Sequence, residues 1–180
     1  MKIKSILIAM VLFVTPVFAS QNYPLTTPYN IPALSAVFPA SDNNAGIEVT
    51  PASGVTTTSD KTAYTGDVYS VSNRNGDASF NVAYFDYSTT RATGAADLDN
   101  VVDASIASMK MVLVPNSREN TSFAGLFARE GHAVSDTLEA YVIVTAVGSR
   151  CYLALVVFDK SLHGTEQDAN DFFASVKAGR

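Results

Sequence analysis

The sequence predicts one α+β domain built on an antiparallel sheet. Short apolar alternations separated by turn residues between positions 47 and 87 indicate strands that pair with their neighbours. Two longer runs near the C-terminus are apolar on both faces, which indicates central strands covered on both sides. Two segments with apolar residues three and four positions apart supply the helices.

The first 19 residues have the features of a cleavable bacterial secretory signal. Two lysines precede an apolar run over residues 6–18, and Ala19 places a small residue at the expected cut. The run is shorter than the ~20 apolar residues of a spanning helix, and Pro16 interrupts it. Ser20 follows the cut, where a lipoprotein would have cysteine. We therefore expect a periplasmic or secreted product without a membrane span.

Size, charge and cysteine content limit the functions open to the mature chain. Removal of 19 of the 180 residues leaves 161, the size of one domain. Ten basic residues, which are the total of 12 minus two in the leader, against 17 acidic ones give a net charge of −7. This charge argues against nucleic acid and anionic membranes as partners. Cys151 is the only cysteine, so we expect a buried thiol and no disulfide-linked partner.

The N-terminal half of the mature chain is expected to form a lead-in and a meander. Three prolines make residues 20–32 an extended lead-in, because proline blocks helix formation. Residues 33–38 form a first strand, and the domain is expected to span 33–180. Short strands follow between 47 and 87, with a hairpin loop at 73–77 because Asn and Gly tolerate positive φ.

A helix is expected to begin at Asp97, a plausible N-cap, and to continue to about Met109. Asp99 and Asp103 share one face of this helix, which we interpret as a solvated face and not as a metal site. A strand is then predicted over residues 123–130, followed by a turn that starts at Gly131 and His132.

The C-terminal part contains the predicted central hairpin and a closing helix. Residues 137–147 and 151–158 are the two strands that are apolar on both faces, joined by Gly148 and Ser149 in a tight turn. Thr165 and Asp168 resemble a capping box at the start of the last helix. The apolar stripe of this helix is expected to cover at least one face of the sheet.

Arg129, Glu130 and His132 form the most promising candidate binding site, because they concentrate charge and an imidazole between two strands. The ordinary alternative is a polar surface turn. The sequence has no HExxH pattern, no G-x-S-x-G elbow and no glycine-rich phosphate loop. We therefore predict no catalytic residue, no metal and no cofactor.

Six phrases, in order along the chain, resemble bacterial members of the PsbP-like fold. They are Leu34–Pro39, Phe80–Tyr87, the helix after Asp97, Gly125 with Ala128–Glu130, Tyr141–Val157 and Asp168–Val176. This fold is shared by an extrinsic photosystem II subunit, a Ran-binding nuclear-import factor, and secreted bacterial proteins and lipoproteins. The resemblance implies an α/β/α sandwich, with a sheet of about six or seven strands flanked by helices on both faces, and it implies no enzyme activity.

Together these features predict an exported, non-catalytic binding or assembly module that acts on a protein partner in the cell envelope. One alternative is a small-ligand carrier with a pocket between the sheet and the helix over residues 97–109. Another is a hydrolase or metal-dependent enzyme built around Arg129, Glu130 and His132.

Overall fold

The computed structural model describes residue 23 and residues 25–39, 46–55, 62–72, 77–89 and 94–178. Three parts of the sequence predictions lie outside the described residues: the signal, residues 20–22 and 24 of the lead-in, and residues 73–76 of the hairpin loop.

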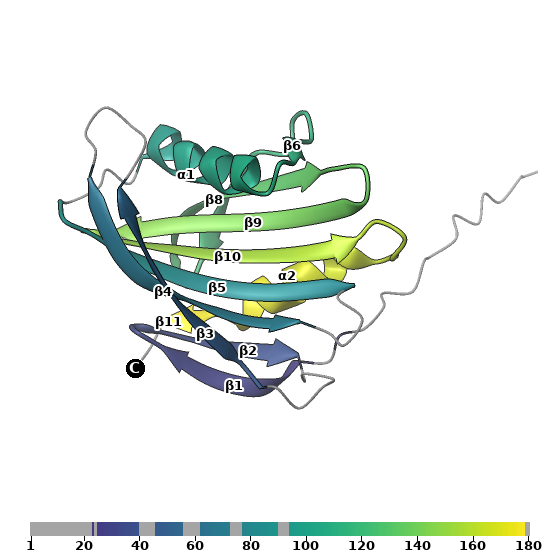
Figure 1. The fold of residues 1–180 in the computed structure, drawn as a ribbon, viewed down its shortest axis with the longest axis horizontal. Coiled ribbons are helices and arrows are strands. Elements are labelled where there is room, and N and C mark those ends of the chain that lie inside the picture. Colours follow the sequence, from purple (N-terminus) through teal and green to yellow (C-terminus); the bar gives the residue numbers. More distant parts are fainter. Residues whose placement is uncertain are drawn as a thin grey trace, which may run out of the picture.

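Eight strands form a large antiparallel sheet with the order β3-β4-β5-β10-β9-β8-β6, and β7 also pairs with β8 (Figure 1). A second antiparallel sheet has the order β1-β2-β11. The strands of the large sheet are β3 (Glu48–Val55), β4 (Ala63–Ser72), β5 (Ala78–Tyr87), β6 (Val112–Leu113), β7 (Glu119–Phe123), β8 (Leu126–Val134), β9 (Leu138–Val147) and β10 (Arg150–Asp159). The small sheet contains β1 (Leu25–Ile31), β2 (Leu34–Pro39) and β11 (Lys177–Ala178), and the helices are α1 (Ala95–Ser108) and α2 (Thr165–Ser175).

The predicted α/β/α sandwich is wrong. Of the described residues, 58% lie in strands and 19% in two helices, and the strands form sheets of eight and three. The difference arises partly in the segment interpreted as an extended lead-in, which contains β1 and pairs with β2. Pro28 lies in β1 without breaking the sheet, because an edge strand tolerates a missing N–H.

The prediction of central strands buried on both sides is confirmed for β9 and β10. On one face, Leu98, Val102 and Ile106 of α1 pack with Val142 and Val144 of β9.

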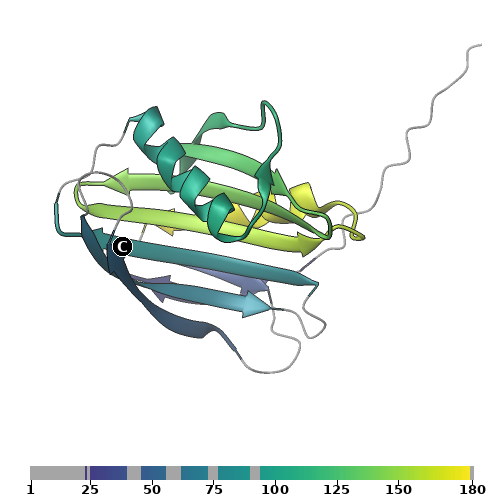
Figure 2. The same cartoon turned by 45° about the horizontal axis from the view of Figure 1, so that its top comes forward.

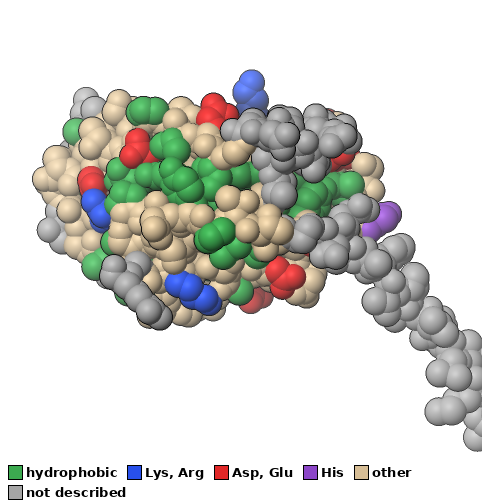
Figure 3. Space-filling view, turned by 90° about the horizontal axis from the view of Figure 1, so that it is seen from below, with side chains coloured by type: hydrophobic (Ala, Val, Ile, Leu, Met, Phe, Trp, Pro, Cys, Tyr) green, Lys and Arg blue, Asp and Glu red, His purple; other side chains and the backbone are tan. Residues whose placement is uncertain are grey.

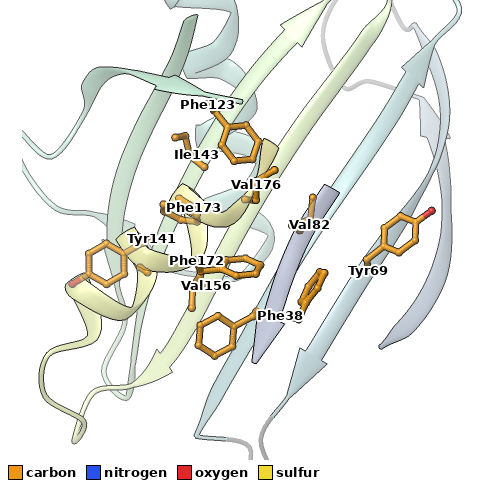
Figure 4. Packing of buried hydrophobic residues seen from close by; sticks show 14 of the residues in the cluster. Phe38, Tyr69, Val82, Phe123, Tyr141, Ile143, Val156, Phe172, Phe173 and Val176 are labelled. Carbon is orange, nitrogen blue, oxygen red and sulfur yellow. The ribbon is translucent and has the colours of Figure 1, made fainter. Parts of the chain in front are cut away.

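The opposite face packs against α2 and the small sheet. Figure 4 shows Phe172 and Phe173 of α2 beside Ile143 and Val156 of the large sheet. The ring centroid of Phe172 lies 5.3 Å from that of Phe38 in β2 and 5.3 Å from that of Phe80 in β5, so α2 and both sheets meet in one aromatic cluster. No helix of the described residues is long and apolar enough to cross a membrane.

Two local predictions around the central hairpin are confirmed. Cys151 is buried, with 1% of its surface exposed. Gly148 turns the chain between β9 and β10 with φ of 59°, a conformation that glycine adopts easily.

The predicted turn at Gly131 and His132 is wrong, because β8 continues through both residues to Val134. The turn lies earlier, at Ala124 and Gly125, which have φ of 52° and 81°. Gly131 is needed for close packing instead: a Cβ there would lie 3.0 Å from Cγ1 of Val102 in α1.

The helix starts also differ from the predicted caps. Gly94 is the N-cap of α1, three residues before Asp97. The second helix begins at Thr165 as predicted, but its N-cap is Gly164 and neither helix has a side-chain cap hydrogen bond.

Candidate functional site

Strand β8 separates the three predicted site residues onto two faces of the sheet. Arg129 lies opposite Val144 and points to the α1 face, whereas Glu130 and His132 lie opposite Ile143 and Tyr141 on the α2 face. Successive side chains of a strand point in opposite directions, so these residues do not converge on one site. The predicted strand over residues 123–130 already separates Arg129 from Glu130, whereas the predicted turn at Gly131 and His132 left the direction of the His132 side chain open.

Arg129 is held by neighbours from α1 and β7. Its Nε and Nη2 donate to the two carboxylate oxygens of Asp99 at 2.7 and 3.3 Å, and Nη1 donates to Asn120 Oδ1 at 2.6 Å. Arg118 adds a 3.7 Å ion pair with Asp99 and another with Asp103. The two aspartates interpreted as a solvated helix face are therefore ion-paired, and they connect α1 to β8 and to Arg118, the residue before β7.

His132 is fixed by its side chain and by its backbone. Its ring stacks on Tyr141, with centroids 4.5 Å apart and planes inclined by 4°. Its Nε2 lies 2.8 Å from Glu139 Oε1. Its backbone N–H donates to Ser117 Oγ at 3.2 Å. This hydrogen bond lies between the part of β8 that pairs with β7 and the part that pairs with β6.

Glu139 is the centre of this arrangement, although the sequence did not single it out. Its Oε1 also accepts the hydroxyl of Tyr141 at 3.1 Å, and its Oε2 accepts the hydroxyl of Thr165 at 2.8 Å. We call His132, Glu139, Tyr141 and Thr165 the Glu139 cluster. The available signal was a single carboxylate in the otherwise uncharged strand LEAYVIVTAV.

The electrostatics of the cluster favour a neutral Tyr141. Burial raises the pKa of Tyr141, and the nearby Glu139 carboxylate raises it further. The hydroxyl of Tyr141 therefore keeps its proton and donates a hydrogen bond to Glu139.

Glu130 lies on the same face in an acidic environment. Burial raises the pKa of this carboxyl, as do the negative charges of Glu119 and Glu166. Glu119 lies directly opposite Glu130 in the β7–β8 pair. The raised pKa of Glu130 therefore follows first from burial and then from the like charges of β7 and the start of α2.

The cluster has limited catalytic chemistry. The described residues contain no group of three or more His, Cys, Asp or Glu side chains that could hold a metal. Covalent catalysis needs a nucleophile in contact with its base. Here the hydroxyl of Thr165 contacts a carboxylate base, Glu139, but Thr165 is buried, which keeps this hydroxyl from a substrate in solution.

A second polar cluster lies at the other end of β10. Arg150 donates from Nε and Nη2 to both carboxylate oxygens of Asp86 at 2.6 Å, and its guanidinium lies 5.0 Å from the ring centroid of Tyr84. Tyr84 donates to Asp67 at 2.7 Å, and this hydrogen bond raises the pKa of Tyr84 to about 12. The hydrogen bonds from Arg150 lower the pKa of Asp86.

Aromatic rings continue this cluster toward the small sheet. The rings of Tyr69 and Tyr84 lie 6.5 Å apart, and Tyr29 of β1 lies 5.5 Å from Tyr69. Hydrophobic side chains also gather on the underside of the molecule, with charged side chains around them (Figure 3). These aromatic rings connect β1 to the large sheet through the buried Tyr69 and the partly buried Tyr29 and Tyr84.

A pocket of about 390 Å³ lies at the C-terminal end of α2 and not between the sheet and α1. It is lined by Ser122, Ala124, Gly125, Phe173, Ala174, Val176, Lys177 and Ala178. This position does not match the one expected for a small-ligand carrier.

The α1 face of the large sheet is only partly covered. The helix packs against β6, β8 and β9, and it does not extend over β4 and β5 (Figure 2). Phe85, Tyr87, Leu155 and Val157 lie beside the α1 core and are partly exposed. We call these four residues the open strip. Tyr64 extends it along β4, with ring centroids 5.5 Å from Phe85 and 5.7 Å from Tyr87.

Comparison of the chain with protein-family models and with curated proteins finds no match.

Proposed function

We propose that the protein is an exported, non-catalytic binding or assembly module that acts on a protein partner in the cell envelope. The observation that carries this proposal is the open strip. Its two aromatic side chains lie near the C-terminal end of β5 and its two aliphatic ones in the C-terminal half of β10, on either side of the buried pair Ala83 and Leu153. Aromatic residues are enriched in the cores of protein interfaces, where their large surfaces become buried.

The dimensions of the sheet support a partner at this position. Strands lie about 4.8 Å apart, and helices pack about 8–10 Å from each other. One helix therefore covers roughly two strands, as α1 does over β8 and β9. A partner segment beside α1 would lie over β10 and β5, on Leu155, Val157, Phe85 and Tyr87.

The internal pairing of the polar residues favours binding over the rival enzyme. Arg129 is bound to Asp99 and Asn120, and His132 to Glu139. These side chains hold elements of the fold together. An enzyme built around Arg129, Glu130 and His132 would need them to act on one substrate, yet they lie on opposite faces of β8.

Site-specific photocrosslinking in intact cells tests the proposal. A benzophenone amino acid at Tyr87 should yield a discrete crosslinked protein, whereas the same group at Phe127, which is 48% exposed in β8, should not. Leu155→Lys should abolish the Tyr87 crosslink, because a charge would have to be buried in the interface.

The proposal fails if Tyr87 gives no crosslink, gives the same products as Phe127, or keeps its product in folded Leu155→Lys protein. Export is tested separately by the mass of the protein from the extracytoplasmic fraction. We expect a mature chain that starts at Ser20.

A further inference from the structure

The start of α2 is attached to the sheet by a side chain from another element. Gly164 is its N-cap, with φ of 74° and no side-chain cap hydrogen bond. Thr165, the first residue of α2, instead donates its hydroxyl to Glu139 Oε2 in β9 at 2.8 Å. The carboxylate therefore lies at the helix N-terminus, where the helix dipole favours a negative charge.

The same carboxylate collects donors from two further positions. His132 of β8 contacts Oε1 at 2.8 Å, and the hydroxyl of Tyr141 donates to this oxygen at 3.1 Å. An ionised carboxylate only accepts hydrogen bonds, so it can serve all three donors at once. The pair is also shielded from solvent, with side-chain exposures of 27% for His132 and 20% for Glu139.

We propose that the Glu139 cluster is a pH-responsive latch, in which ionised Glu139 holds the first turn of α2 on the sheet and protonated Glu139 releases it. Protonation converts one acceptor oxygen into a donor. The three partners all donate in the latched state, so at least one hydrogen bond must be lost or reversed. The charge that strengthens the remaining bonds disappears at the same time.

The elements that carry the latch also hold other titratable and charged side chains. They are His132 and Glu130 from β8, Glu119 from β7, Tyr141 from β9, Glu166 and Asp168 from α2, and Lys160 and His163 from the loop before α2. Of these, Glu119 and Glu166 act on Glu130, and Glu166 acts on Tyr141. The raised pKa of Glu130 means that it is neutralised early as the pH falls. Glu130 is not one of the side chains hydrogen-bonded to Glu139, so its neutralisation leaves the three contacts of the latch in place.

Release is expected to be local. The C-terminal end of α2 is held independently, since Ser175 Oγ lies 3.2 Å from both the backbone nitrogen and the carbonyl oxygen of Val37 in β2. Phe172 is fully buried in the aromatic core. The movement should therefore involve the turn over residues 165–168 and leave the rest of α2 packed.

Hydrogen exchange measured by mass spectrometry between pH 4 and pH 7 tests the latch on the full chain. After correction for intrinsic exchange rates, protection of the backbone amides of Gln167, Asp168 and Ala169 should fall about tenfold or more at the acidic end, because a hydrogen bond to a charged group is lost. Amides of β10 should keep their protection. Glu139→Gln should have low protection in the first turn at every pH.

Two further variants distinguish a latch from general acid destabilisation. Thr165→Val retains the Glu139 carboxylate and removes only its bond to α2, so it should also abolish the pH response. Glu130→Gln removes a neighbouring carboxylate outside the cluster and should keep the response. The latch is refuted if first-turn protection does not change with pH, if β10 opens in parallel, or if Glu130→Gln abolishes the response while Glu139→Gln keeps it.

Discussion

At the scale of single residues, Gly131 explains why β8 passes straight through a segment whose sequence suggests a turn. The sequence shows a glycine beside a polar histidine, which is a common turn signal. It does not show that α1 lies over that glycine, with Val102 Cγ1 3.0 Å from the position of a Cβ. The glycine is required by a contact 29 positions away, and local sequence carries no information about it.

The loss of stability on replacing a glycine of the sheet should depend on which atoms the new Cβ contacts. Gly131→Ala meets only the ends of side chains, and overpacking should lower the free energy of unfolding by roughly 1–3 kcal/mol. Gly66→Ala should cost more, because its Cβ would overlap the backbone carbonyl oxygen of Tyr84. Urea unfolding measures both. Gly94→Ala, whose Cβ meets only Asp97 at 3.4 Å, adds no close contact, so any loss of stability there reflects its position as the N-cap of α1.

Glu130→Gln should stabilise the protein at neutral pH. The folded state raises the pKa of Glu130 above its ordinary 4.5, so the folded chain binds a proton more tightly than the unfolded chain. Stability linked to this group is therefore present below pH 4.5 and is lost as the pH rises through the folded pKa.

Thermal unfolding at several pH values measures this difference. The melting temperature of Glu130→Gln should exceed that of the wild type at pH 7, and the two should converge below pH 4.5. Glu48→Gln, an exposed change in β3, controls for the altered net charge. A difference that persists unchanged at acidic pH would contradict the electrostatic origin.

At the scale of elements, α1 is attached to the sheet edge by Arg129 and Asp99 as well as by its apolar stripe. Both side chains are largely buried, with exposures of 12% and 22%. A double-mutant cycle with Arg129→Met and Asp99→Asn should give a coupling energy of roughly 1.5–3 kcal/mol in urea unfolding. The pair of Arg118 and Asp103 is the control: Asp103 is 54% exposed, and its coupling should be about 0–1 kcal/mol. Equal couplings would show that burial is not decisive.

Elements differ in how far local sequence determines them. The hairpin of β9 and β10 was predictable because its strands are apolar on both faces and its turn contains Gly148. Strand β1 was not, because its prolines suggest a lead-in and only pairing with β2 makes it a strand. The Glu139 cluster also depends on tertiary structure: Glu139 and Thr165 are 26 positions apart, and they meet only when α2 folds back onto β9.

At the scale of the whole molecule, both sheets end in an edge strand that contains a proline. Strand β3 ends the large sheet and contains Pro51, and β1 ends the small sheet and contains Pro28. Proline interrupts the row of backbone donors that would allow edge-to-edge pairing between molecules. The second sheet, which was not predicted from the sequence, adds a further edge strand, β1. In this strand Pro28 also interrupts the row of backbone donors.

Removal of the proline from the β3 edge should therefore promote self-association. Pro51→Val restores an N–H donor and adds a β-branched residue near Val49, which is 42% exposed. Light scattering during incubation below the melting temperature should show faster growth of aggregates than in the wild type. Ser53→Val adds a similar side chain to the same strand but leaves Pro51 in place, so it should aggregate more slowly than Pro51→Val. If both variants aggregate equally, added hydrophobicity and not the restored donor is the cause.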